Sequence, residues 1–130
     1  MKQKHKMNLL LLEDDPDDFY LMKESLLMNE DANITILHAE RLSKALDVAG
    51  KSAIDIAVLD LNLPDSIGLD TFISFHQRYP SIPVIIMSGV NDVDLAVSAV
   101  QKGARDFICK GEAASVVMSK INRYVINDKV

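Results

Sequence analysis

The chain has 130 residues, with 14 Lys and Arg against 19 Asp and Glu, so its formal net charge is −5. This length fits one domain of roughly 100–200 residues, and 48% hydrophobic residues are enough for a buried core rather than a disordered chain. The acidic balance argues against direct nucleic-acid binding. The single cysteine argues against a disulfide or a cysteine-rich metal site, and the short apolar runs argue against a membrane span. We therefore expect a cytoplasmic protein.

Short apolar runs alternate along the chain with stretches in which apolar residues recur at helical spacing. Continuous apolar runs suit strands that are buried on both faces, as in a parallel sheet. The runs predict five strands, at Leu9–Leu12, Ile34–Leu37, Ile54–Leu59, Ile82–Met87 and Phe107–Cys109. Five strands that alternate with five helices predict an α/β fold, (βα)5, with an open, doubly wound five-stranded parallel sheet.

Several residues indicate where the helices begin and end. Asp15 followed by Pro16 is a helix start, with an N-cap acid and Pro at the first helical position. Gly50 and Gly103 are expected to close the second and fourth helices, and Pro80 to follow the third. We expect a flexible N-terminal tail at 1–7, the folded domain at 8–126, and a C-terminal tail at 127–130, where a further domain could begin.

Polar side chains follow four of the five predicted strands. The first strand runs into Glu13 and Asp14, the third into Asp60, the fourth into Ser88 and the fifth into Lys110. With strand order 2-1-3-4-5 these residues meet at the carboxyl edge of the sheet, where doubly wound folds bind ligands. Clustered carboxylates need a cation, and oxygen ligands suit Mg²⁺. With an ammonium and a hydroxyl beside them, they predict a phosphoryl site in which Asp60 is the nucleophile.

Four motifs, LLLLEDD, AVLDLNLPDSIG, VIIMSG and DFICKG, resemble those of the receiver domain of two-component response regulators over residues 8–126. The resemblance implies a flavodoxin-like sheet with strand order 2-1-3-4-5 and a Mg²⁺ cofactor. It also implies the following roles: Asp60 as phosphoacceptor, Asp14 as direct Mg²⁺ ligand, Glu13 as its partner outside the direct ligands, the Asn62 main-chain carbonyl as a further metal ligand, Ser88 as switch hydroxyl, Phe107 as switch aromatic, and Lys110 as the phosphate-pairing lysine.

The resemblance also implies partners. A histidine kinase or phosphotransfer protein would donate its phosphoryl group to Asp60, and an output domain or effector would read the change. The domain would catalyse its own phosphorylation and dephosphorylation without acting on a separate substrate. The face formed by the fourth helix, fifth strand and fifth helix would serve output and dimerisation. The first helix, which carries Phe19, Met22, Lys23 and Leu26, is expected to lie close to the kinase contact.

The chain departs from the family pattern at two glycines. Gly111 replaces the proline that usually follows the lysine, and Gly89 leaves an uncrowded approach to the phosphoryl group, from which we expect faster phosphoryl loss. Two alternatives remain at this stage. One is a receiver-like interaction module that works without phosphorylation. The other is a phosphatase of the haloacid dehalogenase type, which needs an aspartate where this chain has Asn62.

Overall fold

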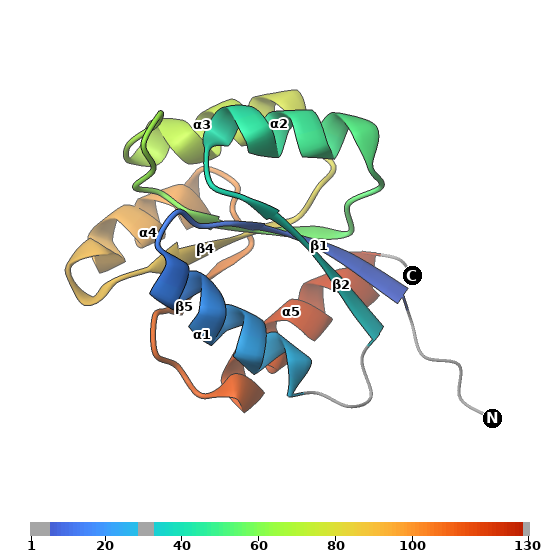
Figure 1. The fold of residues 1–130 in the computed structure, drawn as a ribbon. Coiled ribbons are helices and arrows are strands. Elements are labelled where there is room, and N and C mark those ends of the chain that lie inside the picture. The colour runs from blue at the N-terminus through green and yellow to red at the C-terminus, as the bar shows by residue number, and fades with distance from the viewer. Residues whose placement is uncertain (1–5, 29–32, 129–130) are drawn as a thin grey trace.

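The computed structural model describes residues 6–28 and 33–128, in which strands and helices alternate (Figure 1). A short 3₁₀ helix, η1, precedes α4. The elements are β1 (Lys6–Leu12), α1 (Pro16–Leu27), β2 (Asn33–Ala39), α2 (Leu42–Lys51), β3 (Ile56–Asp60), α3 (Leu69–Arg78), β4 (Val84–Ser88), η1 (Val90–Asp92), α4 (Val93–Gln101), β5 (Asp106–Cys109) and α5 (Ala114–Asp128).

The five strands form one parallel sheet in the order β2-β1-β3-β4-β5, which confirms the predicted topology. Helices α1 and α5 pack on one face, and α2, α3 and α4 pack on the other (Figure 1). Because all strands run the same way, their carboxyl ends lie at one edge of the sheet. The register brings Asp60 beside Met87 and Ser88 beside Cys109 at that edge.

Strand β1 shows why its sequence is a continuous apolar run. Leu10 and Leu12 belong to the core beneath α2 and α3, whereas Leu9 and Leu11 belong to the core beneath α1 and α5. All four side chains are 0% exposed. Burying a leucine stabilises a fold by about 1.5–3 kcal/mol, so both faces of this strand anchor the loop that follows it.

Strand β1 and helix α5 each extend two residues past the limits predicted for the folded domain. Strand β1 begins at Lys6, and Met7 is only 5% exposed, so the end of the expected tail is part of the sheet. Helix α5 continues to Asp128 and past the expected boundary at 126. Residues 1–5 and 129–130 of the two expected tails lie outside the described residues.

We expected Gly50 to end α2, but this was wrong: the helix continues through Gly50 to Lys51. The hydroxyl of Tyr79 donates a hydrogen bond to the carbonyl oxygen of Leu46 at 2.8 Å. A Cβ atom on Gly50 would lie 2.8 Å from that hydroxyl, so any other residue here would have to displace the Tyr79 side chain. Glycine therefore stands here because Tyr79 approaches the helix closely.

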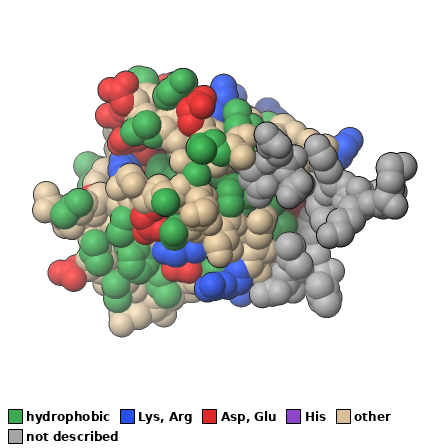
Figure 2. All heavy atoms as spheres, turned by 90° about the horizontal axis from the view of Figure 1, so that it is seen from below, with side chains coloured by type: hydrophobic (Ala, Val, Ile, Leu, Met, Phe, Trp, Pro, Cys, Tyr) green, Lys and Arg blue, Asp and Glu red, His purple; other side chains and the backbone are tan. Residues whose placement is uncertain are grey.

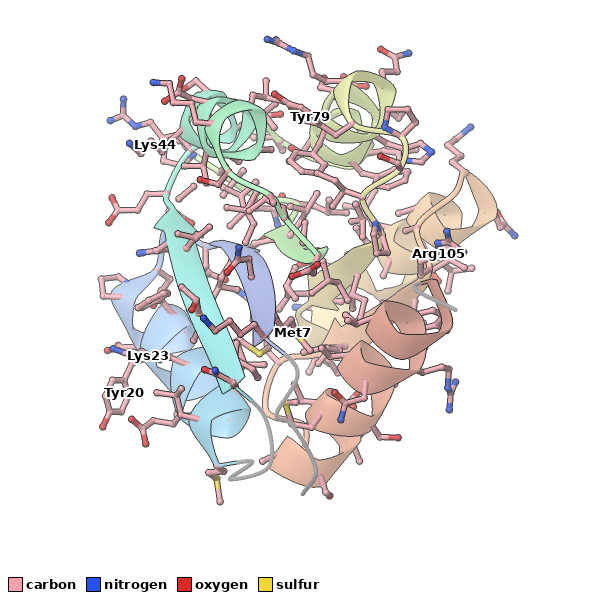
Figure 3. All side chains as sticks on the ribbon, turned by 90° about the vertical axis from the view of Figure 1, so that its right-hand side faces the viewer. Met7, Tyr20, Lys23, Lys44, Tyr79 and Arg105 are labelled. Atoms are coloured by element: carbon pink, nitrogen blue, oxygen red, sulfur yellow. The ribbon has the colours of Figure 1, made fainter. Side chains whose placement is uncertain are left out.

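Helix α1 buries Met22 and Leu26 against the sheet. Tyr20 and Lys23 project away from the sheet (Figure 3), and Tyr20 is 59% exposed. The face covered by α1 and α5 carries a group of acidic side chains toward its left end (Figure 2). Within the part of the chain described, no helix is both long and apolar enough to cross a membrane.

Candidate functional site

Three carboxylates meet at the carboxyl edge of the sheet. Glu13 and Asp14 directly follow β1, and Asp60 is the last residue of β3. One carboxylate oxygen from each lies within 4.8 Å of the others. Glu13 is 0% and Asp60 6% exposed, whereas Asp14 is exposed. The neighbouring strands β1 and β3 thus bring together the three acids that the strand-end pattern singled out.

Lys110 supplies the positive charge of this cluster. Its Nζ lies 2.9 Å from Asp60 Oδ2 and 3.3 Å from Glu13 Oε2. A third carboxylate, Asp18 Oδ2, lies 2.7 Å away. Burial opposes the ammonium charge, but hydrogen bonds to Asp18 and Asp60 outweigh it and raise the pKa of Lys110 above its ordinary value. The lysine therefore stays charged.

Asp18 is a site residue that the strand-end pattern does not mark, because it lies in the first turn of α1. The contact with Lys110 joins residues 92 positions apart in the chain. No sequence spacing marks such a contact. The available signal was indirect: α1 begins at the same edge of the sheet as the strand ends, so its first turn faces the cluster.

Glu13 is held in place from several sides. The backbone N–H of Asp15 donates to Glu13 Oε1 at 3.0 Å, and a ring nitrogen of His38 lies 2.7 Å from the Glu13 carbonyl oxygen. The His38 ring stacks on Phe19 with 3.7 Å between ring centres. Within the described part of the chain, Glu13 Oε2 is buried and has no hydrogen-bond partner. Burial and the neighbouring Asp60 raise the pKa of Glu13 to about 8, against the lowering effects of the Asp15 N–H and Lys110.

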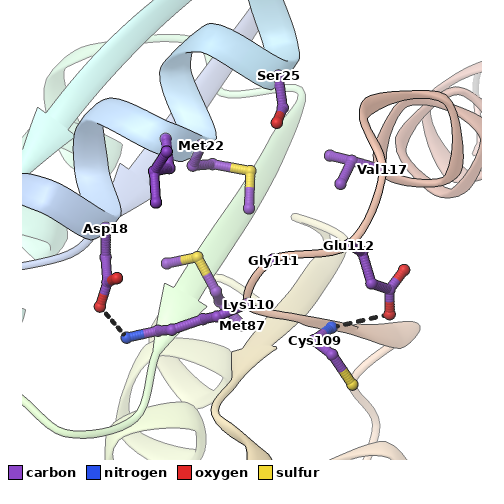
Figure 4. A pocket seen from close by; sticks show the side chains of 10 residues that line it. Asp18, Met22, Ser25, Met87, Cys109, Lys110, Gly111, Glu112 and Val117 are labelled. Atoms are coloured by element: carbon purple, nitrogen blue, oxygen red, sulfur yellow. Dashed lines mark hydrogen bonds and ion pairs between the residues drawn. The ribbon is translucent and has the colours of Figure 1, made fainter.

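The turn that carries Lys110 is closed without the usual proline. The Glu112 N–H donates to the Cys109 carbonyl oxygen at 3.1 Å, and the Cys109 N–H donates to Glu112 Oε1 at 3.0 Å (Figure 4). Gly111 has φ +92°, a conformation that favours glycine. The Lys110 N–H also donates to the Ser88 carbonyl oxygen at 2.8 Å. Glycine and Glu112 together shape this turn.

The remaining predicted site residues lie around the cluster. The Asn62 N–H donates to Asp60 Oδ1 at 2.9 Å. Ser88 is 2% exposed, and its hydroxyl donates to the Gly89 carbonyl oxygen at 3.0 Å rather than to a carboxylate. Phe107 is half-buried beside the core under α2, α3 and α4. The structure thus brings Asn62 to Asp60, whereas the hydrogen bond of the Ser88 hydroxyl is to the Gly89 carbonyl oxygen and that of the Phe107 N–H is to Asp106.

The loop after β3 is tied to α2 by Asp65, a residue that the sequence analysis did not single out. Its carboxylate accepts hydrogen bonds from the N–H groups of Leu42 at 2.8 Å and Ser43 at 3.1 Å. It thereby caps a helix whose own N-cap, Arg41, offers no side-chain acceptor. Although desolvation works in the opposite direction, these hydrogen bonds lower the pKa of Asp65.

Charge and donor type decide what this site can hold. Glu13, Asp14 and Asp60 offer only oxygen ligands. When all three are ionised, the single positive charge of Lys110 does not neutralise their combined negative charge. A hard divalent cation prefers such ligands. An ammonium beside a nearly buried carboxylate also suits the negative oxygens of a phosphoryl group.

The family model of the response regulator receiver domain matches residues 9–122. The chain belongs to this family. The receiver domain is similar to the DNA-binding transcriptional regulator NtrC of Escherichia coli K12, with 34% identity over 97 residues. That match covers 72% of this chain and 21% of NtrC, so the receiver domain spans about a fifth of this curated relative.

Solved structures of receiver domains agree with the fold. The signal receiver domain of a LuxO repressor protein from Vibrio parahaemolyticus has a TM-score of 0.83 and 30% identity, and the match covers 96% of this chain and 94% of that one. NtrX from Brucella abortus has a TM-score of 0.85 and 26% identity, over 96% of this chain and 28% of that one. The receiver domain is therefore a module of two-component response regulators.

Proposed function

We propose that this receiver domain accepts a phosphoryl group on Asp60 in a Mg²⁺-dependent reaction, with a histidine kinase or phosphotransfer protein as donor. The observation that carries the proposal is the position of Asp60. Its carboxylate is nearly buried at the end of β3, with Lys110 Nζ at 2.9 Å and two further acids beside it. Family membership supports the same chemistry.

The residues at the site fit a magnesium ion. Glu13 Oε2 is buried without a hydrogen-bond partner, and the three acids form an oxygen-only donor set. Asp14, Asp60 and the main-chain carbonyl of Asn62 would hold the ion, with Glu13 behind them. When bound, Mg²⁺ would neutralise the phosphoryl oxygens during transfer.

Each side chain has a separate task in the proposed reaction. A carboxylate oxygen of Asp60 forms a bond to phosphorus while the phosphorus–nitrogen bond of the donor histidine breaks, and the electron pair of that bond returns to the imidazole. Lys110 pairs with the phosphoryl oxygens, and Ser88 turns its hydroxyl toward them. The domain catalyses this step on itself and turns over no separate substrate.

The proposed output surface is the face formed by α4, β5 and α5. Once Ser88 turns toward the phosphoryl group, Phe107 rotates into the space that it leaves, and the face changes shape. Val97 on α4 and Val116 on α5 are each 41% exposed, and exposed apolar side chains on these two helices would suit a dimer contact. Light scattering with and without a phosphoryl mimic tests this, and a mass that does not change would contradict dimerisation on activation.

The central experiment is labelling by a small phosphodonor such as acetyl phosphate. We expect intact-mass spectrometry to find one added phosphoryl group on the wild type with Mg²⁺ and none with EDTA. Asp60→Asn should not be labelled. Asp70→Asn, which neutralises an exposed acid in the first turn of α3, is the matched control and should be labelled as the wild type is.

The same experiment separates the alternatives. If the wild type stays unlabelled with Mg²⁺ and donor present, the phosphoacceptor function is refuted, and an interaction module without phosphorylation takes its place. Continuous release of phosphate from added phosphomonoesters would instead indicate a phosphatase. Family membership favours neither alternative.

A further inference from the structure

The three carboxylates around the Lys110 ammonium belong to two different groups. Asp60 and Glu13, at 2.9 Å and 3.3 Å, are members of the predicted metal cluster. Asp18, the nearest at 2.7 Å, lies outside that cluster. Figure 4 shows Asp18 reaching from α1 to the end of the lysine side chain. Lys110 therefore has one carboxylate partner that a cation in the cluster would leave free.

Asp18 is well placed to hold the ammonium at this position. The Asp15 side chain accepts hydrogen bonds from the backbone N–H groups of Asp17 and Asp18, which fixes the first turn of α1. Farther along the helix, buried Met22 and Leu26 anchor α1 on the sheet. The Asp18 carboxylate is thus a short side chain on a rigid base, at the border of the cluster.

An ammonium and a divalent cation compete for the same carboxylates. If Lys110 stayed close to both Asp60 and Glu13, its charge would repel an ion bound in the cluster. Asp18 gives the ammonium a partner outside the cluster. Lys110 can therefore lose its contacts with Asp60 and Glu13 and still be paired with a carboxylate. From there it is still near Asp60, where a phosphoryl group would be formed.

We propose that Asp18 is a positioning residue for Lys110: it holds the ammonium at the edge of the Glu13–Asp14–Asp60 cluster and thereby strengthens metal binding. This role rests on the proposed function, because it presumes that the cluster binds Mg²⁺. The inference differs from a simple charge effect in one respect. Asp18 acts through Lys110, so its contribution depends on the lysine being present.

A double-mutant cycle on the whole chain tests this dependence. Mg²⁺ affinity is measured by titration calorimetry at constant ionic strength for the wild type, Asp18→Asn, Lys110→Met and the double variant. We expect Asp18→Asn to weaken binding about fivefold with Lys110 present, a change typical of the coupling between contacting residues. With Lys110→Met already in place, the second change should alter affinity by less than about twofold.

Two further variants separate positioning from charge and from folding. Asp17→Asn removes the same charge from the same helical turn, at an exposed residue, and should change affinity by less than about twofold. Asp18→Glu keeps the carboxylate and should restore most of the affinity. Urea unfolding of each variant checks that the fold is intact.

The outcomes separate this inference from the proposed function. A wild type that binds no Mg²⁺ would overturn the metal site and this role of Asp18 together. If the wild type binds but Asp18→Asn behaves like Asp17→Asn, the metal site stands and the positioning role is refuted. An equal loss with and without Lys110 would also refute it, because Asp18 would then act on the metal directly.

Discussion

Glu13→Gln is the sharpest test of the electrostatics of the site. The substitution keeps the shape of the side chain and removes its ability to ionise. The carboxyl is 0% exposed, and burial raises its pKa from 4.5 to about 8 in the absence of metal. A carboxyl with a higher pKa in the folded chain than in the unfolded chain binds its proton more tightly when folded. The contribution of Glu13 to the stability of the wild type therefore falls as pH rises from 4.5 to about 8.

The size of the effect follows from this window. Within it, the free energy of unfolding of the wild type falls relative to that of the variant by about 1.4 kcal/mol per pH unit. At pH 7, roughly 2.5 units above the ordinary value, the accumulated difference is about 3 kcal/mol. The amide oxygen can still accept from the Asp15 N–H, but the amide nitrogen meets Lys110. The variant should therefore be more stable by about 1–3 kcal/mol at pH 7.

Urea denaturation followed by circular dichroism, in EDTA at several pH values from 5 to 9, measures this difference. Groups that titrate alike in both proteins cancel when the two curves are subtracted. Asp70→Asn is the matched control, because Asp70 is an exposed acid outside the cluster, and it should change stability by less than about 0.5 kcal/mol. Parallel pH curves for the wild type and Glu13→Gln, or a less stable variant at pH 7, would refute the reasoning.

Three other substitutions test separate parts of the structure. Asp65→Ala removes the cap of α2 and should cost about 1 kcal/mol of unfolding free energy in urea denaturation; an unchanged midpoint would contradict the capping role. Gly111→Ala puts a side chain at φ +92° and should lower the free energy of unfolding by about 1 kcal/mol. Gly111→Pro should lower it further, because the proline ring requires φ near −65°. Equal stability of the wild type and both variants would count against the turn described. Gly89→Met, whose Cβ has room at 3.4 Å from the nearest side chain, should slow loss of the phosphoryl group in a chase after donor removal, and a faster loss would disprove the uncrowded-approach hypothesis.

Much of the fold could be predicted because its signals are local. Apolar runs buried on both faces indicate parallel strands, and the order β2-β1-β3-β4-β5 agrees with the prediction. Asp15 caps α1 as its position before Pro16 indicates. The meeting of Glu13, Asp14 and Asp60 follows from the same rule, since the ends of parallel strands share one edge.

The errors concern contacts between distant segments. Gly50 has the local appearance of a helix stop, yet the hydroxyl of Tyr79 is the reason for it. Asp18 has the local appearance of a first-turn acid, yet its carboxylate meets Lys110. In both cases the local pattern is compatible with an ordinary role, and only the packing of another element on the residue reveals the specific one.

The acidic balance and the crowding of acids after β1 are properties of the sequence, as is the resemblance of its four motifs to a receiver domain. Those features alone determine the fold class and which strand ends carry charge. The tertiary structure decides how the charges are shared: Glu13 is buried beside Lys110, Asp14 stays exposed, and Asp18 joins Lys110. The reason is physical, because burial and ion pairing depend on distances across the fold that no linear spacing encodes.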